Sequence, residues 1–101
     1  MNDLIKVRAR IKYFKSDKGR QSPFLSGYRP AFTFNGARTI LSGRINLIEK
    51  DSFAQGDIGE VEINFLKDMI DDNYFKVGQK FTFAEGFSPL GEGEITEVIN
   101  V

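Results

Sequence analysis

The chain has 101 residues, with 14 basic and 14 acidic side chains, so its formal net charge is zero. It contains neither cysteine nor histidine, which excludes disulfides, thiolate or imidazole metal sites, and Ser-His-Asp or Cys-His catalytic centres. The length predicts a single domain over residues 1–101 with a modest hydrophobic core. We therefore expect a chain that is not an enzyme and that holds no metal.

The clearest predicted strand runs from Leu4 to Lys15. Apolar residues alternate there with charged residues, which is the pattern of a strand that has one buried face and one solvent-facing face. The outward face of this strand is basic throughout. It carries Lys6, Arg8, Arg10 and Lys12.

The segment 19–34 holds two of the three prolines, Pro23 and Pro30. Proline fixes its own φ and biases the preceding residue towards an extended conformation, so neither a helix nor an uninterrupted central strand fits here. We expect a rigid, extended segment that turns at Gly27 and then enters a strand. The apolar side chains that we expect it to pack into the core are Phe24, Leu25, Tyr28, Phe32 and Phe34.

The remainder of the chain predicts four more strands, separated by turns. Their expected ranges are Thr39–Ile48, Glu60–Phe65, Lys80–Phe83 and Ile95–Val101. Gly43 indicates a bulge or bend in the first of them, residues 67–78 indicate a turn or a short helical turn, and the glycines in 85–93 indicate a loop. Six short strands without a helix of normal length predict an all-β barrel or sandwich, and a barrel has no exposed sheet edges.

Several motifs resemble one known family. These are Gly19-Arg20, Pro23-Phe24, Gly27-Tyr28-Arg29-Pro30 and Phe32-x-Phe34, followed in order by Gln55-Gly56-Asp57, Lys80 to Gly86 and Gly91-x-Gly93. Together they resemble the C-terminal β-barrel domain of bacterial translation elongation factor Tu. The resemblance implies a stand-alone, six-stranded antiparallel β-barrel of Greek-key topology.

In that family the barrel docks on a GTPase domain, helps to hold the T-stem of aminoacyl-tRNA and contacts the nucleotide-exchange factor. The resemblance makes Arg20 a candidate phosphate contact. Arg29 is also retained. Several tRNA-facing positions differ, since Gln21, Ala31, Ala84 and Phe87-Ser88 stand where the family has histidine, glutamine, arginine and a Gly-Arg pair. No Gly-Lys-Ser/Thr phosphate loop is present, so we expect no nucleotide binding by this chain alone.

The row of basic residues on the first strand has two interpretations. Alternate residues on a strand lie about 6.6 Å apart, close to the spacing of phosphates along a nucleic-acid strand, so the row could follow RNA or an acidic protein groove. The interpretation that we favour is structural, with the row paired across strands to Glu60, Glu62, Glu94 or Glu97. Residues 1–50 carry 11 basic and 3 acidic side chains, whereas residues 51–101 carry 3 and 11. This asymmetry favours neighbouring strands of opposite sign over one basic and one acidic face.

Two weaker site patterns remain. A stacking platform for bases needs exposed rings, and only Tyr13, Phe53, Tyr74 and Phe87 are plausible as such. The acidic residues Asp51, Asp71 and Asp72 lack the spacing of a calcium loop, which favours solvated turns.

We therefore predict a non-catalytic binding module that recognises an intracellular protein, with a component of the translation machinery as one candidate. The first alternative is binding of tRNA or structured RNA through the basic strand face. A second alternative is neutralisation of a toxin that attacks translation. We expect a cytoplasmic protein without cofactor or membrane contact, because no signal peptide or apolar span is visible. The candidate binding residues are Lys6, Arg8, Arg10, Lys12, Arg20 and Arg29.

Overall fold

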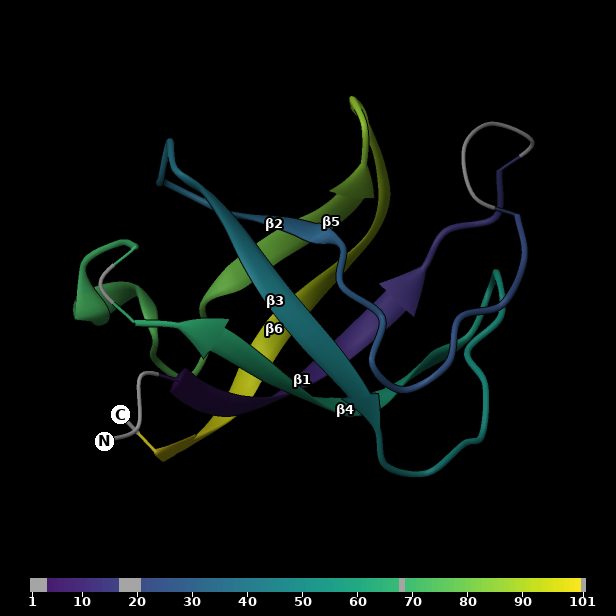
Figure 1. Cartoon of the computed structure of the whole chain (residues 1–101), viewed down its shortest axis with the longest axis horizontal. Helices are drawn as coiled ribbons and strands as arrows, with labels where there is room; N and C mark the ends of the chain where they lie inside the picture. Colours follow the sequence, from purple (N-terminus) through teal and green to yellow (C-terminus); the bar gives the residue numbers. More distant parts are fainter. Residues whose placement is uncertain (1–3, 17–20, 68, 101) are drawn as a thin grey trace.

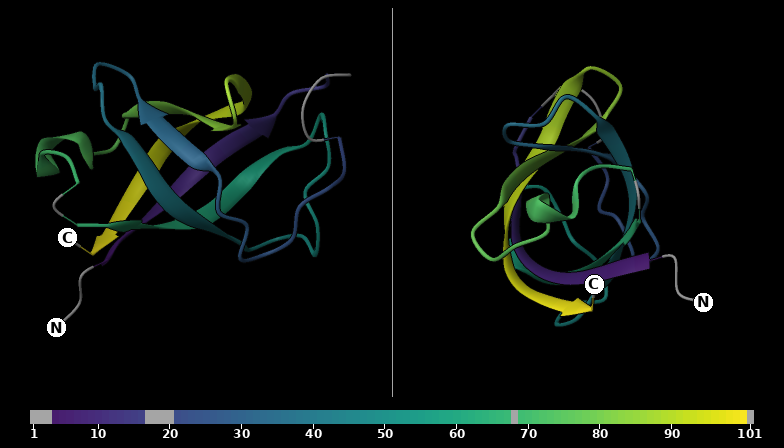
Figure 2. Two further views of the ribbon diagram at one scale, coloured as in Figure 1. Left: turned by 45° about the horizontal axis from the view of Figure 1, so that its top comes forward. Right: turned by 90° about the vertical axis from the view of Figure 1, so that its left-hand side faces the viewer.

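The structure is a computed structural model that describes residues 4–16, 21–67 and 69–100. Its strands are β1 (Leu4–Tyr13), β2 (Ala31–Phe34), β3 (Ile40–Leu47), β4 (Ile58–Leu66), β5 (Lys80–Glu85) and β6 (Ser88–Asn100). A single 3-10 turn, η1 (Asp72–Tyr74), lies between β4 and β5. The strands close into a barrel in the order β1-β4-β3-β2-β5-β6 (Figure 1). The right-hand view of Figure 2 shows them ringed around one interior.

Every pair of neighbouring strands in this barrel is antiparallel. The prediction of a closed six-stranded antiparallel barrel is therefore confirmed. The run β1-β4-β3-β2 places the first strand beside the fourth, which is a Greek-key arrangement. In this arrangement β1 lies between β4 and β6. Both neighbours belong to the acidic half of the chain, residues 51–101.

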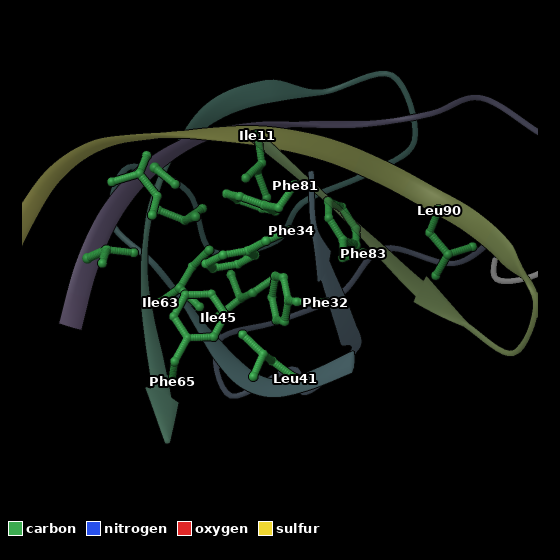
Figure 3. Packing of buried hydrophobic residues seen from close by; sticks show 14 of the residues in the cluster. Ile11, Phe32, Phe34, Leu41, Ile45, Ile63, Phe65, Phe81, Phe83 and Leu90 are labelled. Atoms are coloured by element: carbon green, nitrogen blue, oxygen red, sulfur yellow. The ribbon is translucent and has the colours of Figure 1, made fainter. Parts of the chain in front are cut away.

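The barrel interior is filled mainly by phenylalanine rings. Phe32 meets Phe65 edge to face, with centroids 5.0 Å apart, and Phe34 meets the same ring at 5.3 Å. Phe81 and Phe83 of β5 complete this cluster (Figure 3). Edge-to-face contacts of this kind add about 0.5–1.5 kcal/mol each to the burial of apolar area. The alternation predicted for the first strand is confirmed, because all its inward residues are buried.

Gly43 lies on the inner face of β3, where we expected a bulge. The pairing of β3 with β2 reaches Ser42 and its pairing with β4 begins at Gly43, both without a register shift, so of the predicted bulge or bend the bulge was wrong. A Cβ at this position would lie 2.7 Å from a ring carbon of Phe32 and 2.9 Å from one of Phe65. The glycine is needed because two core rings occupy the space of a side chain.

The segment 85–93 is not the loop that its glycines indicated. β5 and β6 are joined by a tight turn at Gly86-Phe87, where Gly86 has a φ of +77°, and β6 begins at Ser88. Gly91 and Gly93 belong to this strand and face the rings of Phe83 and Phe81. Glycine serves here to let a strand pass close to the core, which the sequence pattern does not distinguish from loop flexibility.

The proline-rich segment packs largely as expected. Phe24 is buried and forms an isolated bridge with Phe53, and Tyr28 stacks on Phe24 at 4.6 Å. Gly27 makes the predicted turn with a φ of +97°. Leu25 is 63% exposed, so its assignment to the core was wrong. Phe24 is held by its bridge to Phe53 and Tyr28 by its bridge to Ile45 of β3, whereas Leu25 lies between them and faces outward.

Candidate functional site

The four predicted basic residues of the first strand lie together on the outer face of β1. The register places Arg8 opposite Glu62 of β4 and Glu97 of β6, and it places Arg10 opposite Glu60 and Glu94. The Arg8 guanidinium lies 3.5 Å from the Glu62 carboxylate. The expected cross-strand arrangement with these glutamates is therefore present for Arg8 and Arg10, whereas Lys6 stands opposite Asn64 and Asn100.

The alternation of charge extends beyond β1. Lys12 stands opposite Glu92 of β6, and Glu94 has Lys80 of β5 on its other side. Across four strands the positions Lys80, Glu94, Arg10 and Glu60 thus alternate in sign. The basic first half and the acidic second half of the chain interleave because β1 pairs with two strands of the second half. Each such pair contributes only about 0.2–1 kcal/mol, and a phosphate backbone laid along Arg8 and Arg10 would also meet the glutamates that stand opposite them.

Of the other two predicted residues, the structure describes only Arg29. Arg20 is outside the described residues. Arg29 lies on the segment beside β3, apart from the cleft described below, and is exposed. Four of the six candidate residues therefore lie together on β1. Arg29 is not among them, because it belongs to the segment before β2.

Of the four candidate exposed rings, two are in the core. Tyr13 and Phe53 are each 1% exposed, so their prediction as exposed rings was wrong. Tyr74 is half-buried, and its hydroxyl donates to the carbonyl oxygen of Gly36 at 3.1 Å. Phe87 projects fully from the β5–β6 turn, with an exposure of 106%. These four rings do not form a stacking platform.

A cleft of about 680 Å³ lies where the end of β1 meets the starts of β4 and β6. Phe14, Ile58 and Pro89 supply its apolar surface, and Lys12 and Lys15 supply its charge. Ile58 is 48% exposed and Phe14 is half-buried. We call this the β1–β6 cleft. Sequence reasoning missed it, although Phe14 directly after inward-facing Tyr13 breaks the alternation, and that break was the available signal.

Hydrogen bonds hold the rim of the β1–β6 cleft. The Gln55 side chain accepts from the Ser16 amide at 3.2 Å and donates to the Ser16 carbonyl at 2.9 Å. The Gly56 amide donates to the Tyr13 carbonyl, and the Phe14 amide donates to the Leu90 carbonyl at 2.8 Å. The stem of Lys15 lies across Gly56, where an added Cβ would come within 2.7 Å of Lys15 Cε. The apolar groups of the cleft are therefore presented on a fixed backbone.

Asp57 secures the loop that carries this rim. Its carboxylate accepts from the Ala54 amide at 2.9 Å and lies 3.3 Å from the Lys50 ammonium. The hydrogen bond from Ala54, with a smaller contribution from Lys50, holds the pKa of Asp57 below its ordinary value of 3.8. The ionised form is thus the one that the folded loop favours.

The β5–β6 hairpin presents Phe87 at its turn. The Tyr28 hydroxyl donates to the Glu85 carboxylate at the base of the turn, and Glu85 pairs with Ser88 across it. Phe87 is two residues before Pro89, which lines the cleft. The Phe87 ring is in full contact with water, so it adds no buried apolar area to the fold.

No model of a known protein family matches this sequence. Within the described ranges, no helical segment has the length and apolar character needed to cross a bilayer. The same residues contain no group of three or more carboxylates placed to share a metal ion. Asp71, considered above for a cation, caps η1 by accepting from the Asn73 amide at 2.9 Å.

Proposed function

We propose that this chain is a non-catalytic module that recognises an intracellular protein, and that the β1–β6 cleft together with Phe87 is its recognition surface. The observation that carries the proposal is exposed apolar surface on a rigid frame. Ile58, Pro89 and Phe87 are all exposed, although the barrel has a complete core without them. Preorganised apolar and aromatic groups are the usual anchors of protein interfaces, because little conformational entropy is lost when they bind.

The charge at the cleft defines the partner further. Lys12 and Lys15 line it, so the complementary surface carries an apolar anchor with acidic residues beside it. Such charges mainly raise the association rate and select the partner, whereas burial of the apolar anchor supplies affinity.

We further propose that the barrel is a divergent relative of the C-terminal domain of elongation factor Tu, with a partner from the translation machinery. Support comes from the closed Greek-key barrel and from the roles of two resembling motifs. Gly27 and Tyr28 end a turn that begins at Leu25, and Tyr28 bridges to Ile45 of β3; Gly91-x-Gly93 lets β6 pass over the core rings. Neutralisation of a toxin that attacks translation would be a special case of the same recognition.

RNA binding along β1 has less support. An RNA backbone on this face would lie against the glutamates of β4 and β6 as well as the cations of β1. The β1–β6 cleft adds two lysines, but its one aromatic ring, that of Phe14, is half-buried, and a stacking platform needs exposed rings.

The test uses the full chain as bait in extract from its native cell. The variants Phe87→Ser and Ile58→Asp alter the proposed surface, and Val77→Ser is the matched control, since Val77 is 66% exposed in the segment between η1 and β5. We expect one protein to be retained in stoichiometric amount by the native chain and the control, and to be reduced about tenfold or more by both cleft variants.

Three results would contradict the proposal. The first is the absence of any stoichiometric protein, and the second is equal retention by all four chains. The third is retention of tRNA with an affinity that falls steeply as salt rises, which is the signature of phosphate contacts and would favour the RNA alternative instead.

A further inference from the structure

One row across the sheet breaks the alternation of charge. Tyr28 bridges to Ile45, and Ala31 pairs with Ser42. The same antiparallel register continues between these two pairs, so the residue after Tyr28 stands opposite the residue before Ile45. Arg29 is therefore opposite Arg44. Arg44 in turn stands opposite Asn64 of β4, so this row holds two adjacent arginines and an amide.

The arginine pair is uncompensated by the described parts of the chain. Both side chains are exposed, and no hydrogen bond or ion pair joins either guanidinium to another described residue. The nearest outward carboxylate along β4, that of Glu62, is already engaged by Arg8 at 3.5 Å. Like charges at opposite positions destabilise a sheet. The neighbouring rows place glutamates opposite arginines, whereas the row of Arg29 and Arg44 does not. This departure indicates that a bound anion neutralises the two arginines.

The two arginines also line a hollow of about 150 Å³, together with Ser42, Asn64 and two leucines, Leu4 and Leu66. This space exceeds the requirement of one water molecule by about tenfold. Asn64 Oδ1 is buried and has no hydrogen-bond partner among the described residues. The hollow therefore combines two guanidinium groups with the Ser42 hydroxyl, all of which can donate hydrogen bonds, whereas the unpartnered Oδ1 of Asn64 is an acceptor and adds no donor for an anion.

Gly27 lies beside the side chain of one of the cations. Its φ is +97°, and a Cβ built there would lie 3.7 Å from an Arg44 guanidinium nitrogen. The bare backbone of this turn thus lies directly beside the Arg44 side chain. The turn itself is fixed, since the Gly27 amide donates to the Ile45 carbonyl at 2.8 Å.

We propose that Arg29 and Arg44 form a binding site for a phosphate monoester dianion. A monoester phosphate carries a charge of about −1.5 to −2 and three acceptor oxygens, which matches two guanidinium forks. A carboxylate or a phosphodiester carries one negative charge and would leave one arginine uncompensated. Free phosphate and a phosphorylated serine of a partner protein share this chemistry. The site is separate from the β1–β6 cleft and does not depend on the function proposed for it.

The experiment titrates the full chain with inorganic phosphate and with O-phosphoserine at low ionic strength, by calorimetry and by amide chemical shifts. We expect saturable one-to-one binding, with shifts at Ser42, Arg44 and Asn64. Arg29→Gln and Arg44→Gln should each weaken binding about tenfold or more. The control Arg38→Gln removes the same charge from an exposed position between β2 and β3 and should leave binding unchanged. The affinity for phosphate should fall as the pH is lowered through the second phosphate pKa of about 6, because the dianion becomes a monoanion.

Several outcomes would overturn the proposal. They are the absence of saturable binding, equal loss in the Arg38→Gln control, and acetate or dimethyl phosphate binding as tightly as phosphate. If both arginine variants failed to fold, the chemical-shift map of the native chain would still decide, because shifts confined to other surfaces exclude the site. Tighter binding of phosphoserine than of phosphate would assign the ligand to a modified partner, and equal binding would assign it to free phosphate.

Discussion

Replacing Gly91 by alanine tests why glycine occurs inside β6. Gly91 pairs with Tyr13 of β1 and with Phe83 of β5. A Cβ there would lie 2.2 Å from the Lys12 carbonyl oxygen and 2.3 Å from Phe83 Cζ. The carbonyl belongs to a paired strand, and the ring is fully buried, so neither can move without disturbing the barrel.

The expected cost follows from these contacts. Overpacking a core typically costs about 1–3 kcal/mol, and the contact with backbone places Gly91→Ala towards the upper end. Alanine also restricts the unfolded chain, which offsets about 0.4–1 kcal/mol. We therefore expect a net loss of roughly 2 kcal/mol in the free energy of unfolding, or roughly 8–16 °C in Tm for a domain of this size. Gly93→Ala should cost less, because its Cβ would meet the side chains of Phe81 and Ile11 rather than backbone.

The measurement is urea unfolding followed by far-ultraviolet circular dichroism, with the slope m checked for constancy. Glu92→Ala is the matched control on the same strand, since its side chain is outward and its loss removes only a cross-strand pair of about 0.2–1 kcal/mol. A Gly91→Ala chain as stable as the native one, or more stable than Glu92→Ala, would refute the explanation of close approach and favour flexibility as the role of this glycine.

Two further predictions concern charge. Asp57 has a folded pKa below its ordinary value of 3.8, so its contribution to stability is present above that value and is lost as pH falls through the folded pKa. Asp57→Asn should therefore lower the free energy of unfolding near neutral pH and match the native chain in strong acid, and a deficit that persists in urea titrations in strong acid would contradict this. Arg44→Gln should stabilise the phosphate-free protein by about 0.2–1 kcal/mol, because it relieves the repulsion with Arg29. This gain should shrink as salt is added; a destabilised variant at low salt would show that the two arginines do not repel.

The strands were predictable because their signal is local. Apolar and charged residues alternate around Val7 and Arg8, and likewise around Glu62 and Ile63. This alternation predicts which side chains face inward without knowledge of the partner strand. The closed barrel followed from six such segments and from the resemblance to a known barrel. The turn at Gly27 was predictable for the same reason, since it depends on nearby residues.

The candidate sites depended on tertiary structure. A glycine that needs a positive φ, such as Gly86, and one that needs space, such as Gly91, look alike in a sequence, because the neighbour that excludes a side chain is far away in the chain. The charge of a strand's outward face can be predicted from the local sequence. Whether opposite charges on neighbouring strands neutralise it depends on the strand register. Arg10 stands opposite glutamates and Arg29 stands opposite Arg44 only because of which strands become neighbours. The sequence alone therefore determined the inward and outward faces, and the pairing of distant strands decided which outward charges remain available to a ligand.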